Sequence, residues 1–306
     1  MNNTQLIVIL GCTATGKTRL AANLASKING EIISADSRQV YKGMDVGTGK
    51  DLSEFTVGDQ QIPYHLIDIV DAGTEYNVFQ YQKDFINTYE NIVKRKKQAI
   101  LCGGTGMYLE AVIKGYRLIQ IPENQILRNE LASKTTDELV HLLISYKIPH
   151  NSTDTIHRKR TIRAIEIAKY EHEKTAMMQG FPIMNHQIFG VHFERELLKE
   201  RITERLKTRL KNEGMIEEVE GLLKTGITPE KLNYYGLEYK LITQFVLGEI
   251  NRNELFTKLN IAIHQFSKRQ TTWFRRMEKK GLEINWIDGN LSLNEKVNLI
   301  TNRLYE

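Results

Sequence analysis

The chain has 306 residues and a formal net charge of +5, which is too small to indicate a nucleic-acid partner by itself. Its length corresponds to about two domains, and it has no run of 18 apolar residues that could span a membrane. Its two cysteines exclude a disulfide framework or a four-cysteine zinc site and fit a reducing compartment. We therefore expect a cytoplasmic protein with no membrane partner.

The first predicted strand, residues 6–10, leads into the sequence GCTATGKT at 11–18, and a helix continues from there through Leu24. This is the phosphate-loop pattern G-x-x-x-x-G-K-[ST] in its expected place between a strand and a helix. Backbone N–H groups, a lysine ammonium and a hydroxyl for Mg²⁺ converge in such a loop, which predicts that it binds a diphosphate or triphosphate. The residues assigned to it are Gly11, Thr13, Ala14, Thr15, Gly16, Lys17 and Thr18, with Thr18 as the ligand of Mg²⁺.

Strand and helix patterns alternate over the first 115 residues. This alternation predicts an α/β fold, in which a parallel sheet that carries the phosphate loop is flanked by helices. Ligands bind at the carboxyl ends of the strands in such a sheet. Further strands are predicted at 31–34, 64–69 and 98–102, and helices at 78–97 and from about Met107.

The pattern is helical from Arg117 to about His186, and we interpret residues 117–186 as a helical insertion domain. Residues 1–116 and 187–306 then form the phosphate-loop core, which ends in basic helices. Helices are predicted at 123–132, 135–146 and 153–172 in the insertion and at 194–212, 214–224, 237–248, 252–279 and 291–304 in the core, with strands at 187–193 and 284–287.

Polar clusters follow two of these strands. Asp36, within SADSRQVY at 34–41, could accept a proton or position a nucleophile, but an aspartate there could equally cap a helix or form an Asx turn. Gly103-Gly104-Thr105-Gly106 follows the strand at 98–102, where the glycines could let the backbone approach a ligand and Thr105 offers a hydroxyl. No acid ends that strand to hold Mg²⁺, which weakens the interpretation as a nucleotide hydrolase or kinase.

Basic residues are concentrated in two segments. Residues 268–280 contain six of them against one acid, with Trp273 and Phe274 between them, and residues 157–163 contain five with no acid. Basic and aromatic residues together fit a surface that contacts a nucleic-acid backbone. A solvated helix face would have the same composition, so this feature alone does not decide between the two.

Together these clusters resemble the tRNA dimethylallyltransferase family, also called the tRNA isopentenyltransferases. The matching stretches occur in family order across most of the chain, and SADSRQVY and KRQTTWFR are the specific ones. They are GCTATGKT (11–18), SADSRQVY (34–41), DVGTGK (45–50), HLID (65–68), GGTGMYL (103–109), RTIRAIE (160–166), GMIEEV (214–219) and KRQTTWFR (268–275).

The resemblance implies transfer of a dimethylallyl group from dimethylallyl diphosphate to the N6 amine of the adenosine 3′ to the anticodon in tRNA, with Mg²⁺ as cofactor. Asp36 would be the general base, Lys17 would neutralise the diphosphate and Thr105 would bind the bridging oxygen of the leaving group. The insertion at 117–186 would bind the anticodon stem-loop, and we expect the enzyme to be a monomer. The implied tRNA contacts are Asp36, Ser37, Arg38, Gln39, Thr105, Arg128, Lys159, Arg160, Thr161, Ile162, Arg163, Lys268, Arg269 and Arg275.

Some positions depart from the family pattern. Cys12 replaces a proline, the segment 234–240 lacks the arginine that normally assists with the diphosphate, and Ile263-His264 replaces a Thr-Arg pair. Lost cations near a diphosphate lower the rate, which leaves a non-catalytic tRNA-binding relative as one alternative. The others are an adenylate isopentenyltransferase acting on free AMP, ADP or ATP, which would need neither the insertion nor the basic helix, and a phosphate-loop nucleotide kinase.

Overall fold

The computed structural model describes residues 5–118, 120–146, 157–173 and 181–305. The chain divides into two compact units. We call Met1–Gly115 together with Ile183–Glu306 the core unit, and Tyr116–Pro182 the insertion unit. Each is described by itself.

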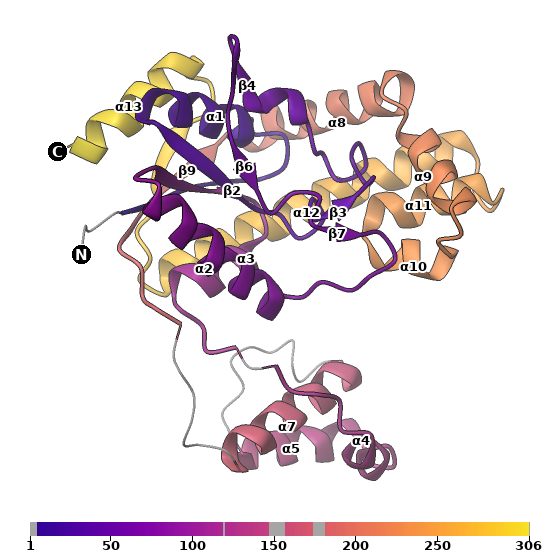
Figure 1. The fold of residues 1–306 in the computed structure, drawn as a ribbon. Coiled ribbons are helices and arrows are strands. Elements are labelled where there is room, and N and C mark those ends of the chain that lie inside the picture. The colour runs from indigo at the N-terminus through magenta and orange to yellow at the C-terminus, as the bar shows by residue number, and fades with distance from the viewer. Residues whose placement is uncertain (1–4, 119, 147–156, 174–180, 306) are drawn as a thin grey trace. The chain divides into compact units, whose positions relative to one another are not determined.

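A six-stranded sheet forms the centre of the core unit, and every pair of neighbouring strands in it is parallel (Figure 1). β1 and β2 are buried along their whole lengths, as expected for strands that are covered by helices on both faces. The predicted α/β fold is therefore confirmed. In sheet order the strands are β10 (Asn285–Asp288), β9 (His186–His192), β1 (Leu6–Gly11), β8 (Gln98–Gly103), β2 (Gly30–Ala35) and β6 (Tyr64–His65).

Helices cover both faces of this sheet. Figure 1 shows α1 (Lys17–Ile28) and α13 (Leu293–Tyr305) on one face, and α2 (Val78–Lys94), α3 (Gly106–Ile113) and α12 (Arg252–Lys279) on the other. Apolar side chains of α1 and α13 pack on alternate residues of the strands, which is the period-two pattern of a sheet face. This packing fixes the start of α1, and with it the phosphate loop, at the carboxyl end of β1.

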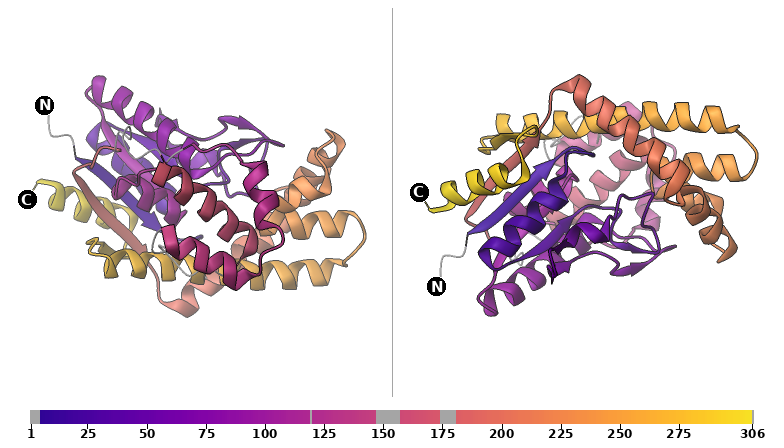
Figure 2. Two further views of the ribbon diagram at one scale, coloured as in Figure 1. Left: turned by 90° about the horizontal axis from the view of Figure 1, so that it is seen from below. Right: turned by 90° about the horizontal axis from the view of Figure 1, so that it is seen from above.

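The C-terminal part of the core unit is a group of helices that lie against α12. Figure 2 shows α8 (Arg195–Asn212) beside α12, with α9 (Met215–Lys224) and α11 (Leu237–Val246) near one end of it. The short helix α10 (Pro229–Tyr234) was not predicted, although Thr228 caps it and proline occupies its first turn. None of the helices in the described part of the chain is long and apolar enough to cross a membrane.

The strand predicted at 64–69 is wrong beyond His65. Only Tyr64 and His65 pair with β2, because Leu66 and Asp68 have left-handed φ angles of 61° and 55° that end the strand. The chain then forms β7 (Val70–Asp71), which pairs with β3 (Tyr41–Lys42) in a separate small sheet. Three other short elements were not predicted: a 3₁₀ helix at Leu52–Phe55, and the hairpin strands β4 (Thr56–Val57) and β5 (Gln60–Gln61).

The described part of the insertion unit contains α4 (Gln125–Leu131), α5 (Thr136–Tyr146) and α7 (Arg158–Glu173). Leucines of α4 and α5 pack on Ile165 and Ala168 of α7 in a small apolar core. The guanidinium of Arg158 donates to the carbonyls of Leu131 and Ala132 at the end of α4, at 3.0 and 2.7 Å. The predicted helix at 153–172 matches α7, and its first residues, 153–156, lie outside the described residues.

Candidate active site

A cavity of about 780 Å³ lies at the carboxyl ends of β1 and β2 in the core unit. It is lined by the phosphate loop, the segments 36–39 and 47–54, α8, the start of α11 and α12. Four of the sequence clusters, at 11–18, 34–41, 45–50 and 268–275, therefore contribute to one cavity. The residues predicted from the sequence that line this cavity are Thr13, Ala14, Gly16, Lys17, Thr18, Asp36, Arg38, Gln39 and Arg269.

The phosphate loop leaves the first turn of α1 open to an anion. Ala14 and Gly16 have left-handed φ angles of 63° and 74°, and Gly16, at the N-cap of α1, provides no side-chain hydrogen bond to the first N–H groups. Gly11 and Thr15 do not line the cavity but shape the loop. The Thr15 hydroxyl donates to the carbonyl of Cys12 at 2.9 Å, and a Cβ at Gly11 would lie 2.6 Å from that hydroxyl.

Three arginines on one side of α8, spaced four residues apart, line the same cavity and were missed by the sequence analysis. The guanidinium of Arg205 donates to the Thr13 hydroxyl, and that of Arg201 donates to the Ala14 carbonyl at 3.0 Å. Burial, together with the nearby charge of Arg209, lowers the pKa of Arg205 to about 10. The spacing of arginines at 201, 205 and 209 could have indicated a basic helix face from the sequence. Only the packing of α8 shows that this face lies against the phosphate loop.

Gln270 connects the phosphate loop to the turn after β8. Its amide oxygen accepts from the Thr13 N–H at 2.9 Å, and its amide nitrogen donates to the Gly104 carbonyl at 3.0 Å. A Cβ added at Gly103 would lie 2.3 Å from the Ala35 carbonyl oxygen, and one added at Gly104 would lie 2.4 Å from the Gln270 amide nitrogen. A Cβ added at Gly106 would lie 2.3 Å from the Trp273 ring. These glycines therefore accommodate other parts of the protein, and their predicted role in letting a ligand approach stays a prediction.

Asp36 forms the Asx turn that the sequence allowed and also lines the cavity. Its Oδ1 accepts from the Arg38 N–H at 2.9 Å in an Asx turn, while its side chain faces the cavity. Oδ2 has no hydrogen bond from any residue that the structure describes. The nearby Thr105 hydroxyl accepts from the Ser37 N–H at 3.0 Å, which ties the turn after β8 to the turn after β2.

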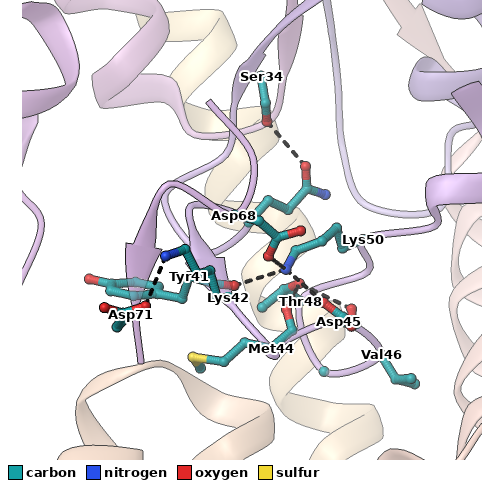
Figure 3. A network of polar contacts seen from close by, with 12 residues as sticks. Ser34, Tyr41, Lys42, Met44, Asp45, Val46, Thr48, Lys50, Asp68 and Asp71 are labelled. Atoms are coloured by element: carbon teal, nitrogen blue, oxygen red, sulfur yellow. Dashed lines mark hydrogen bonds and ion pairs between the residues drawn. The ribbon is translucent and has the colours of Figure 1, made fainter. Parts of the chain in front are cut away.

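The loop at 45–50 forms one wall of the cavity through Gly47, Thr48 and Gly49. Figure 3 shows Lys50 at the centre of a polar network behind this wall. Its ammonium donates to the Tyr41 carbonyl at 2.8 Å and pairs with Asp45 at 2.7 Å and with Asp68, and its side chain is fully buried. The lysine that ends this glycine-rich loop thus lies behind the wall and does not line the cavity.

Gln39 and Glu218 hold the same loop from two sides. The Gln39 amide donates to the Gly49 carbonyl at 3.2 Å and accepts from the Ser34 hydroxyl at 3.1 Å. The Glu218 carboxylate of α9 accepts from the backbone N–H groups of 45, 46 and 47, at 2.7, 2.7 and 3.1 Å. Glu218 belongs to the matching stretch GMIEEV, yet its role cannot be found without knowing that α9 packs on this loop.

The basic residues of the segment 268–280 divide into two groups. Arg276 and Lys280 pair with the fully buried carboxylate of Glu110, at 2.6 and 2.9 Å, and Arg276 also stacks on Trp273 at 3.9 Å. The other basic residues of the segment, which include the predicted contacts, are exposed to solvent. They are Lys268, Arg269, Arg275 and Lys279.

In the insertion unit, the predicted tRNA contacts also divide. Arg128 and Arg163 pair with the buried carboxylate of Glu166, at 2.8 and 2.9 Å, so both guanidinium groups are partly engaged within the unit. Thr161 is buried and its hydroxyl donates to the His157 carbonyl at 3.2 Å, while Ile162 packs against the apolar core. The two contacts that are exposed are Lys159 and Arg160.

The chain is similar to known proteins over most or all of its length. A family model described as IPP transferase matches residues 39–277. The protein named tRNA dimethylallyltransferase 2 from Bacteroides fragilis is 55% identical over 306 residues, which covers 100% of both chains. The protein of the same name from Phocaeicola vulgatus is 56% identical over 305 residues, which covers 100% of this chain and 99% of the relative.

Two solved structures are similar over nearly the whole chain. The full-length tRNA isopentenylpyrophosphate transferase from Bacillus halodurans is 31% identical with a TM-score of 0.72, covering 99% of this chain and 96% of that one. A eukaryotic dimethylallyltransferase acting on tRNA is 23% identical with a TM-score of 0.77, covering 98% of this chain and 77% of that one. The second similarity concerns the fold alone.

Proposed function

Because the chain belongs to the IPP transferase family, we propose that it transfers a dimethylallyl group from dimethylallyl diphosphate to the N6 amine of the adenosine 3′ to the anticodon in tRNA. The observation that supports this reaction is the meeting of the phosphate loop, Asp36 and the α8 arginines in one cavity. Close relatives that cover the full chain carry the name tRNA dimethylallyltransferase. They favour tRNA over free adenine nucleotides as the acceptor.

The phosphate loop and α8 would hold the diphosphate. The open N–H groups at the start of α1, the Lys17 ammonium and the Arg205 guanidinium all face the cavity. As the bond between the allylic carbon and the diphosphate oxygen breaks, negative charge accumulates on the leaving group. Fixed cations and N–H donors stabilise that charge without having to reorganise. Thr105 would then contact the bridging oxygen.

Mg²⁺ fits this site as a partner of the diphosphate. No cluster of three or more histidine, cysteine or acidic residues that could hold a metal occurs in the described ranges. However, Mg²⁺ is commonly held by one or two protein oxygens together with substrate phosphates and waters. The Thr18 hydroxyl, which faces the cavity at the end of the loop, would be the protein ligand. When bound, the ion would offset the charge of the diphosphate.

Asp36 would act as the general base. Its Oδ1 is held by the Arg38 N–H, which orients the carboxylate and leaves Oδ2 to accept a proton. The N6 nitrogen attacks the allylic carbon, the carbon–oxygen bond to diphosphate breaks, and the N6 proton moves to Asp36. The adenosine must leave its stack to reach this position, at a cost of a few kcal/mol that backbone contacts elsewhere can offset.

Exposed cations would provide those backbone contacts. On α12 these are Lys268, Arg269 and Arg275, and in the insertion unit they are Lys159 and Arg160. Arg128, Thr161, Ile162 and Arg163 would mainly shape the surface that carries these two residues, since three of them pack or pair inside the unit and Thr161 is buried. Ser37, Arg38 and Gln39 would bind the flipped adenosine.

One assay tests the proposal. The protein is incubated with labelled dimethylallyl diphosphate and either unmodified tRNA or AMP, and the label in each acceptor is measured. We expect label in tRNA and none in AMP, and loss of transfer in Asp36→Asn by about a hundredfold or more, the range for a removed general base. Label in AMP alone would overturn the proposed acceptor, and full activity of Asp36→Asn would overturn the role of Asp36.

A further inference from the structure

Glu238, which the mechanism above does not use, faces the diphosphate cavity. It lies in the first turn of α11, and it lines the cavity together with Gly236 and Leu237. A Cβ at Gly236, where φ is 130°, would lie 3.8 Å from the Glu238 carboxylate and 3.7 Å from the Arg38 guanidinium. The carboxylate and Arg38 therefore approach the same turn at the edge of the cavity. This segment is the one that lacks the arginine expected from the family pattern.

The two α8 arginines whose charges act on Glu238 are engaged elsewhere. Arg205 donates to Thr13, and Arg209 donates to both oxygens of Asp51 at 2.8 and 2.9 Å. No salt bridge to Glu238 occurs among the residues that the structure describes. The side chain of Glu238 is partly buried in the wall of the cavity. This burial raises the pKa of Glu238 to about 7, against the hydrogen bond from its own backbone N–H and the charges of Arg205 and Arg209. Since no ion pair holds the carboxyl group in its charged form, the neutral form is accessible near neutral pH.

The other charged groups around this cavity come from every element that lines it. The end of β2 contributes Asp36 and Arg38, and the phosphate loop contributes Lys17. Further contributors are Asp51 and Glu54 from the segment 47–54, Glu200, Arg201, Glu204, Arg205 and Arg209 from α8, and Arg269 from α12. Asp36 repels the charged form of Glu238. A bound diphosphate adds negative charge to the same cavity and would shift the equilibrium further toward the neutral acid.

We propose that Glu238 is a carboxylic acid in the diphosphate complex and donates a hydrogen bond to a phosphate oxygen, so that binding takes up one proton at this residue. The proposal rests on the proposed function, because it requires a diphosphate in this cavity. A neutral acid can donate a hydrogen bond where an ionised carboxylate can only accept one. Protonated Glu238 would thereby supply a hydrogen-bond donor without a positive charge, in the segment that lacks the expected arginine.

The test compares the wild type with Glu238→Gln, a neutral donor that cannot titrate. The dissociation constants of dimethylallyl diphosphate and of inorganic diphosphate are measured from pH 6 to pH 8 with saturating unmodified tRNA present. Since a carboxyl group with a pKa of about 7 is about nine-tenths ionised at pH 8, the wild type must take up a proton there and should bind about tenfold more weakly than Glu238→Gln. At pH 6 the two should be nearly equal. Calorimetry in two buffers that differ in ionisation enthalpy should show proton uptake lower in the variant by up to one proton.

Two further variants make the outcome specific. Glu204→Gln removes a carboxylate that lines the same cavity but pairs with Lys207 and is largely exposed, so it should keep the pH profile of the wild type. Glu238→Asp keeps an acid and should keep a pH dependence, which covers the case in which Glu238→Gln does not fold. A constant affinity ratio from pH 6 to pH 8, with tRNA still modified, would overturn this inference alone. A wild type that modifies no tRNA would overturn the proposed function instead.

Discussion

The hydroxyl of Tyr239 donates to the carboxylate of Glu218 at 2.6 Å, and this contact supports the wall of the cavity. The same carboxylate accepts three backbone N–H groups of the loop at 45–47. The Tyr239 ring lies so close to Gly47 that a Cβ there would be 2.7 Å from it. Two helices that are distant in sequence from the loop therefore fix its conformation.

We expect Glu218→Gln to lower the stability of the core unit by about 1 to 3 kcal/mol, because an amide replaces a charged acceptor of four hydrogen bonds. The loop that carries Gly47 and Gly49 would loosen, so the kcat/KM for tRNA should fall more than the affinity for diphosphate. Urea unfolding and steady-state kinetics measure the two effects. Glu217→Gln, on the same turn of α9, is the matched control. Unchanged kinetics in a destabilised Glu218→Gln would show that the wall has no part in catalysis.

Arg205→Met should weaken binding of dimethylallyl diphosphate by about tenfold to a hundredfold, the range for a lost charge-assisted hydrogen bond of about 1.5 to 3 kcal/mol. Arg205 is partly buried, and its guanidinium donates to the Thr13 hydroxyl of the phosphate loop. Equilibrium binding to inorganic diphosphate gives the measurement. Arg195→Met, in the exposed first turn of α8, should bind as the wild type does. Equal binding by both variants would remove Arg205 from the site.

The double variant Lys268→Ala, Arg275→Ala should reduce the salt dependence of tRNA binding. Each phosphate contact that is lost lowers the slope of log K against log salt by about 1, so a decrease of up to about 2 is expected. Filter binding between 50 and 200 mM salt provides the slopes. Lys258, also exposed on α12 but outside the basic segment, supplies the control Lys258→Ala. A slope equal to that of the wild type would mean that this face of α12 does not contact tRNA.

Glu166→Gln should destabilise the insertion unit by about 3 to 5 kcal/mol, because Arg128 and Arg163 lose the buried carboxylate between them. Burial alone would raise the pKa of Glu166, but the hydrogen bonds from these arginines hold it below the ordinary value for a glutamate. The stabilisation is therefore complete above the ordinary pKa of a glutamate, and it is lost as the pH falls through the lowered pKa.

Hydrogen exchange of amides in α4 and α7, measured at neutral and acidic pH, tests this prediction. Exchange should accelerate in the wild type on acidification and be fast at both pH values in Glu166→Gln. Glu130→Gln, at an exposed position of α4, should exchange as the wild type does. Slow exchange in Glu166→Gln at neutral pH would show that the two arginines do not depend on Glu166.

Local patterns in the sequence determined the phosphate loop, most of the strands of the sheet, the helical insertion and the family. They could do so because strand and helix periodicity, and the loop between β1 and α1, depend on residues close to each other along the chain. The strand predicted at 64–69 was wrong beyond His65 because its end depends on backbone angles that the pattern does not show. An apolar alternation does not reveal that Leu66 and Asp68 have left-handed φ angles.

Only the tertiary structure decided which polar side chains meet. The periodicity of a helix shows which face is apolar, but it does not identify the partner of a buried arginine or carboxylate. Arg205 contacts Thr13 across 192 positions of sequence, and Gln270 contacts the same residue across 257. Arg128 and Arg163, predicted to touch tRNA, pair with Glu166, because a buried carboxylate requires cations to offset its desolvation. Sequence alone thus determined where the phosphate loop lies, and packing decided which distant side chains contact it.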